Sequence, residues 1–191
     1  MDRSQLGVVR RRAVSRACGT ALGARASGAA LLAGGLLLAA PACFAQADEP
    51  RTNAFDDPFL QATRELPACP PAEGPLLTAA QVRAQSHLRA EKGTTCHLHG
   101  RCRLPNAFLY DQEIAPRVVR FIQLDPRFAT STIWVVSQRR WVYLKGCVAS
   151  AAQASALVAE VRLIDDVEAV IDELMVGTRG RPPYAVERPL R

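Results

Sequence analysis

The chain has few of the side chains, and none of the short motifs, on which common catalytic sites depend. Histidine occurs three times in 191 residues, at His87, His97 and His99. The sequence contains no nucleophile elbow, Walker phosphate loop, dinucleotide-binding glycine pattern or H-E-x-x-H zinc motif. Asp165 and Asp166 are adjacent carboxylates, but such neighbours in a turn that ends a helix are ordinarily solvated. The sequence therefore predicts a protein that is not an enzyme and needs no cofactor.

The apolar run near the N-terminus is too short to cross a membrane. It covers residues 29–40, includes two glycines, and falls short of the ~20 residues that span a bilayer. Six arginines precede the run and Ala45-Gln46-Ala47 follows it, which is the order of a secretory signal peptide and its cleavage site. We expect cleavage after Ala47 and export of the mature chain. Lipidation of Cys43 is an alternative.

Cleavage at this site would remove most of the net positive charge. Residues 1–47 hold six of the 24 Lys and Arg side chains but only one of the 18 Asp and Glu side chains. The mature chain would be close to neutral. The formal net charge of +6 is therefore no argument for binding to nucleic acid.

Composition divides the exported chain into four further segments. Six prolines make residues 48–76 a predicted linker or irregular arm. Residues 77–110 are expected to form a helix and a Cys/His loop that pack on a single domain, residues 111–177. Residues 178–191, which contain several Arg and Pro, are predicted to be a mobile tail.

The predicted domain reads in order as helix, strand, strand, helix, strand. Asp111 is a candidate N-cap for a helix that stops at Asp125-Pro126, although Pro116 also allows a later start. Strands at 133–137 and 141–148 should pair antiparallel across a short turn. The capping box Ser150-Ala151-Ala152-Gln153 opens a second helix, and a last strand at 167–176 can join the same sheet. The predicted class is α+β, an α-β-β-α-β sandwich with an added, disulfide-linked N-terminal helical segment.

Three segments of this domain carry a resemblance to a known family. They are Asp111-x-x-Ile114-x-x-x-Val118, Leu144-Lys145-Gly146-Cys147-Val148 and Asp166-Val167-x-x-Val170-x-Asp172-x-Leu174-x-Val176. In order and pattern they resemble the BON domain, a module of bacterial envelope proteins. That family usually has glycine in the hairpin turn and before the third strand, where this chain has arginine and aspartate. The resemblance implies a periplasmic, non-enzymatic protein that binds phospholipid headgroups or another envelope protein, with outer-membrane association as an open alternative.

Four cysteines remain after the predicted cleavage. Cys69, Cys96, Cys102 and Cys147 are an even number in an exported chain, which predicts two disulfides. Sequence alone does not choose among the three pairings, but we expect Cys147 to join the segment before Asp111. The alternative is a periplasmic metal or redox site in the run Cys96-His97-Leu98-His99-Gly100-Arg101-Cys102, where thiolate and imidazole suit zinc or copper.

The predicted sheet is apolar on both faces. Alternation places Ile133, Val135, Val142, Leu144 and Val148 on the face that the two helices cover. The opposite face carries Trp134, Val136, Trp141, Tyr143, Cys147, Ile171 and Met175. Such a face is either covered or meets a partner. We expect a helix opened by the capping box at Thr78 to cover it, fastened by a disulfide from Cys147, with an open binding face as the alternative.

The candidate contact site lies at the hairpin turn. Arg139, Arg140 and Trp141 combine two cations with an interfacial aromatic side chain, which suits an anionic membrane surface. The alternative is that these residues form an ordinary solvated turn without a binding role. The predicted partner is an anionic phospholipid surface or another envelope protein, reached by peripheral contact at most.

Overall fold

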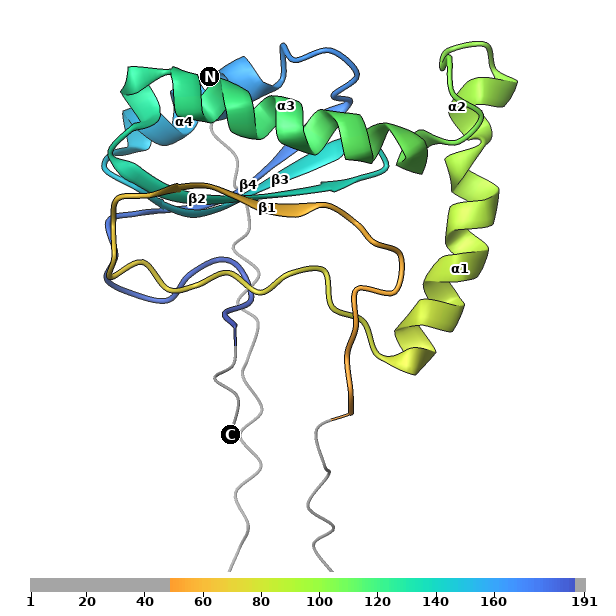
Figure 1. The fold of residues 1–191 in the computed structure, drawn as a ribbon, viewed down its shortest axis with the longest axis horizontal. Coiled ribbons are helices and arrows are strands. Elements are labelled where there is room, and N and C mark those ends of the chain that lie inside the picture. Colours follow the sequence, from red (N-terminus) through yellow and green to blue (C-terminus); the bar gives the residue numbers. More distant parts are fainter. Residues whose placement is uncertain (1–48, 188–191) are drawn as a thin grey trace, which may run out of the picture. The chain divides into compact units, whose positions relative to one another are not determined.

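The structure is a computed structural model that describes residues 49–187. The predicted signal peptide, its cleavage site and Cys43 lie outside these residues. Within them one mixed sheet forms, with the strand order β1-β2-β3-β4 (Figure 1). The strands are β1 (Phe59–Arg64), β2 (Ser131–Gln138), β3 (Trp141–Val148) and β4 (Ala169–Val176). β2 is antiparallel to β1 and β3, and β4 is parallel to β3.

Two helices, α3 (Asp111–Leu124) and α4 (Ala151–Val161), lie on one face of the sheet (Figure 1). The order α3-β2-β3-α4-β4 confirms the predicted α-β-β-α-β arrangement and the α+β class. Helix α3 begins at Asp111 even though Pro116 lies inside it. At the start of α4 the Ser150 side chain accepts a hydrogen bond from Gln153 N at 3.1 Å, which confirms the predicted cap.

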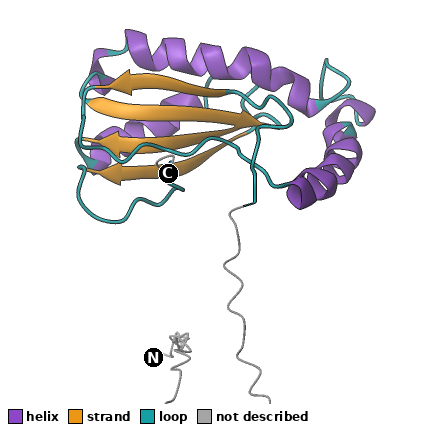
Figure 2. Ribbon diagram, turned by 60° about the horizontal axis from the view of Figure 1, so that its bottom comes forward, coloured by secondary structure: helices purple, strands orange, loops and turns teal. Residues whose placement is uncertain are grey.

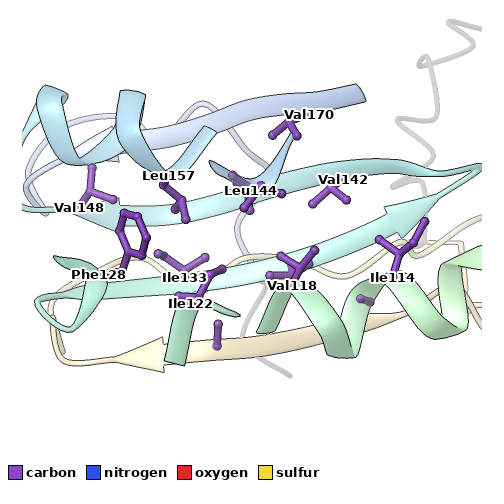
Figure 3. Packing of buried hydrophobic residues seen from close by; sticks show 14 of the residues in the cluster. Ile114, Val118, Ile122, Phe128, Ile133, Val142, Leu144, Val148, Leu157 and Val170 are labelled. Carbon is purple, nitrogen blue, oxygen red and sulfur yellow. The ribbon is translucent and has the colours of Figure 1, made fainter. Parts of the chain in front are cut away.

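The core lies between these helices and the sheet. Ile114, Val118 and Ile122 repeat at helical spacing along α3 and are buried against the strands (Figure 3). The sheet contributes the five side chains predicted for this face, and all of them are buried. Phe128 follows α3 in the short 3-10 turn η2 (Pro126–Phe128) and closes one end of the core.

Two extended segments cross the opposite face of the sheet, which differs from the predicted helical cover (Figures 1 and 2). One precedes the helix α1 (Ala79–Gly93) and the other follows β4. Single bridges join Thr52 to Leu77 and Ala72 to Val186. The predicted capping box of α1 is present, but the helix lies beyond the hairpin end of the sheet and not over its face, because it is polar almost all round and buries only Gly93.

The sheet also contains a strand that the sequence interpretation missed. β1 occupies the proline-free stretch between Pro58 and Pro67 and pairs along β2 as an edge strand, where flanking prolines are tolerated. The segment after β4, predicted to be mobile, is placed as far as Glu187. Glu73 N donates to Ala185 O at 2.7 Å, and Tyr184 is buried beside Cys69.

Candidate functional site

The turn between β2 and β3 consists of two arginines in left-handed backbone conformations. Arg139 and Arg140 have φ angles of 56° and 66°, as in a type I′ turn, where asparagine and glycine are usual. The buried Asp111 carboxylate accepts hydrogen bonds from both amides, at 2.6 and 2.8 Å, and from the Ser137 hydroxyl at 2.7 Å. Asp111 is therefore the anchor of the turn. It is not the predicted N-cap, a position that Tyr110 occupies without a side-chain hydrogen bond.

Two groups near this turn have raised pKa values. Burial raises the pKa of Asp111, and the hydrogen bonds from Ser137 and the two turn amides offset that effect only in part. Burial, and secondarily the charge of Glu173, raises the pKa of the Tyr143 phenol. In both cases the main cause is burial. Burial shifts the pKa values of structural groups as well as catalytic ones, so these shifts do not by themselves indicate proton transfer.

The three predicted contact residues are half-buried and point in different directions. The Arg139 guanidinium stacks over the Trp141 ring, 4.9 Å from the ring centroid. The Arg140 guanidinium turns into the domain, where it donates to Asp166 O at 2.8 Å and to Cys102 Sγ at 3.1 Å. The turn thus brings together Arg139 and Trp141 as a cation and an aromatic ring, while Arg140 is held by internal contacts.

A buried ion pair fastens α1 beside this turn. The Arg89 guanidinium lies between the rings of Phe55 and Phe108, 4.0 and 4.2 Å from their centroids. It forms a two-pronged pair with Asp57, with Nη1 at 2.9 Å from Oδ1. Gln138, at the end of β2, donates to the same carboxylate at 2.6 Å. No sequence signal marks Arg89, because its partners come from distant segments.

The space between α1 and the hairpin end is an aromatic groove of about 300 Å³. We define it by its apolar lining, Leu88, Phe108, Trp141 and Tyr143. The indole Nε1 of Trp141 is buried and has no hydrogen-bond partner among the described residues. The groove is therefore lined largely by apolar side chains, as small-molecule sites often are.

A second hollow, of about 330 Å³, adjoins the groove and shares Lys92 and Arg139 with it. We call it the basic hollow, defined by Lys92, Arg101, Arg139 and Thr95. Glu168 is its one acidic lining residue. The sequence interpretation did not select Lys92 or Arg101. In the sequence they are ordinary charged residues, one at the end of a predicted helix and one in a loop.

A family model for the BON domain matches residues 110–178. This segment of the chain is similar to the BON domain, and the match covers less than half of the 191 residues. No curated protein and no solved structure matches the chain. BON domains are generally non-enzymatic and are generally associated with phospholipids or other components of the bacterial envelope. This similarity is consistent with an envelope-binding role in general terms.

The BON domain accounts for only part of each hollow. Arg139, Trp141 and Tyr143 lie inside the matched segment, whereas Leu88, Lys92 and Arg101 precede it. The turn departs from the family's usual glycine, and the hydrogen bonds from both turn amides to Asp111 stabilise the left-handed conformations that its arginines adopt. Both hollows thus depend on the segment that precedes the BON domain as well as on the BON domain itself.

Both predicted disulfides are present. Cys69 is joined to Cys147, which confirms the link from β3 to the segment before Asp111, and Cys96 is joined to Cys102. The second disulfide occupies both thiols of the alternative metal site. His97 Nδ1 contacts Cys102 O at 3.1 Å, and His99 Nδ1 contacts Thr95 O at 2.8 Å. Between residues 49 and 187 no three His, Cys, Asp or Glu side chains gather as metal ligands.

Among residues 49–187, no helix has the length and apolar character needed to cross a membrane. The BON family is typically found in the periplasm or envelope. The helices around the hairpin end carry exposed leucines. They are Leu88 in α1, Leu98 in α2 (Thr95–Leu98) and Leu109 in η1 (Ala107–Tyr110).

Proposed function

We propose that this protein is a non-enzymatic periplasmic module that binds the headgroups of an anionic phospholipid surface through its hairpin end. The observation that carries the proposal is the stacking of Arg139 on Trp141 where the aromatic groove meets the basic hollow. Cations beside amphipathic aromatic rings are favourable at an anionic membrane interface. Exposed leucines on the neighbouring helices add apolar side chains for shallow contact.

The test is co-sedimentation of the purified protein with vesicles of phosphatidylglycerol and phosphatidylethanolamine, compared with phosphatidylcholine vesicles. A basic residue near an anionic surface contributes about 1 kcal/mol. Arg139→Glu should therefore weaken binding by about 2 kcal/mol, or roughly thirtyfold. Arg139 is preferred to Arg140 because its side chain makes no hydrogen bond or ion pair among the described residues, so its replacement should spare the fold.

Arg120→Glu is the matched control, because Arg120 is an exposed arginine on α3 outside both hollows. It makes the same charge change and should have a smaller effect. Raising the salt concentration should weaken wild-type binding, since exposed charges are screened. Circular dichroism checks that each variant folds. If wild type fails to bind anionic vesicles even at low salt, the proposal is wrong and an envelope protein becomes the better partner.

A further inference from the structure

The basic hollow brings together three cations that have no carboxylate partner among the described residues. Five arginines of the described chain pair with carboxylates, namely Arg51, Arg89, Arg103, Arg117 and Arg127, whereas others, among them Arg120 on α3, do not. Lys92, Arg101 and Arg139 form no ion pair within residues 49–187, although they line one hollow. Three positive side chains therefore share a hollow with the single carboxylate of Glu168, which leaves a net positive charge.

The backbone that carries these cations is fixed from three directions. Lys92 lies in the last turn of α1, which the Arg89 ion pair holds beside the hairpin. Arg101 N donates to Cys96 O at 2.9 Å inside the loop closed by the Cys96–Cys102 disulfide. Arg139 belongs to the turn that Asp111 anchors. A fixed backbone reduces the ordering that a ligand must impose on these side chains.

We propose that the basic hollow is a binding site for a phosphate group. Guanidinium groups bind phosphate oxygens with two parallel hydrogen bonds, and an ammonium group adds a compact charge. A volume of about 330 Å³ admits a phosphate together with a small substituent such as glycerol. The phosphate can come from a lipid headgroup or from a soluble phosphate ester. The lipid source rests on the proposed function, whereas the soluble source does not.

The site extends beyond the BON domain. Two of its three cations, Lys92 and Arg101, precede the residues that match the family. The BON domain alone thus supplies Arg139, and the preceding helix and disulfide loop complete the hollow. The aromatic groove begins beside it, so a bound phosphate would have its substituent next to Trp141 and Leu88.

The experiment has a soluble arm and a vesicle arm. In the first, purified protein is titrated with glycerol 3-phosphate and, separately, with inorganic phosphate by calorimetry. In the second, the same proteins are sedimented with phosphatidylglycerol vesicles. The variants are Lys92→Ala, Arg101→Ala and their combination, with Arg120→Ala as the matched control. Lys92 and Arg101 are exposed and unpaired within the described residues, so their replacement should leave the fold intact, as circular dichroism checks.

The expected result is a five- to tenfold loss of glycerol 3-phosphate affinity for each single variant and a larger loss for the double variant, with Arg120→Ala unchanged. Loss in both arms identifies lipid headgroups as a source of the phosphate. If wild type binds the soluble ester but no vesicles, the hollow stands and the proposed function fails. If wild type binds vesicles, and the double variant binds vesicles and soluble ester as wild type does, the phosphate site is overturned and the proposed function survives. Absence of soluble binding in wild type also overturns the site.

Discussion

Replacement of Asp111 should reveal how an arginine pair can occupy a turn that favours glycine. Oδ1 of Asp111 accepts from the Ser137 hydroxyl and Arg140 N, and Oδ2 accepts from Arg139 N. Asp111→Asn can keep the first two bonds but turns an NH₂ group towards Arg139 N. One hydrogen bond is lost and two donors face each other, which should cost about 1–3 kcal/mol of unfolding free energy.

Asp111→Ala removes all three acceptor contacts and should cost more. The Ser137 hydroxyl is fully buried and loses this partner, whereas the half-exposed turn amides can reach water. We expect a loss of about 2–4 kcal/mol. Urea denaturation of wild type and both variants provides the measurement. A loss below about 0.5 kcal/mol in both variants, or an alanine variant more stable than the asparagine variant, would refute the anchoring role.

The raised pKa of Asp111 predicts a dependence on pH with a definite sign. Because burial raises the folded-state pKa above the unfolded value, the folded protein binds the proton more tightly. The stability from this group is fully present below the unfolded pKa and is lost as pH rises through the folded pKa. The difference in unfolding free energy between wild type and Asp111→Asn should therefore change over the window just above pH 4. A constant difference across that window would contradict the direction of the shift.

Two further replacements test other parts of the fold. Gly146→Ala should lower the free energy of unfolding by about 3 kcal/mol, because the φ angle of Gly146 is 129° and a β-carbon there would overlap the Thr132 carbonyl oxygen. Urea denaturation provides the measurement. A loss under about 1 kcal/mol would show that β3 can shift locally. Arg89→Ala should cost about 3 kcal/mol, since it leaves the buried Asp57 carboxylate without its ion pair. Adding Asp57→Asn to that variant should restore part of the lost stability. Hydrogen exchange should become faster in α1 when Arg89 is replaced. Unchanged exchange in α1 would argue that the Arg89–Asp57 ion pair does not hold this helix.

The sequence was sufficient to predict the helices and strands that local residue patterns mark. Apolar residues at helical spacing predicted α3, alternating residues predicted β2 and β3, and Ser150 with Gln153 predicted the start of α4. These patterns are short-range, because each residue's face follows from its neighbours in the chain. The even number of cysteines that remain after the predicted cleavage predicted two disulfides, but it did not fix every pairing.

Tertiary structure decided what depends on contacts between distant segments. β1 is a strand because β2 offers it a free edge, and α1 lies beyond the sheet because its few apolar side chains cannot cover a face. The candidate site shows the same division. Sequence marked Arg139 and Trp141, but only the folded chain turns Arg140 inward and brings Lys92 and Arg101 to the same hollow. Convergence of that kind is set by the packing of residues far apart in sequence, for which a charged residue in a helix or loop carries no local signal.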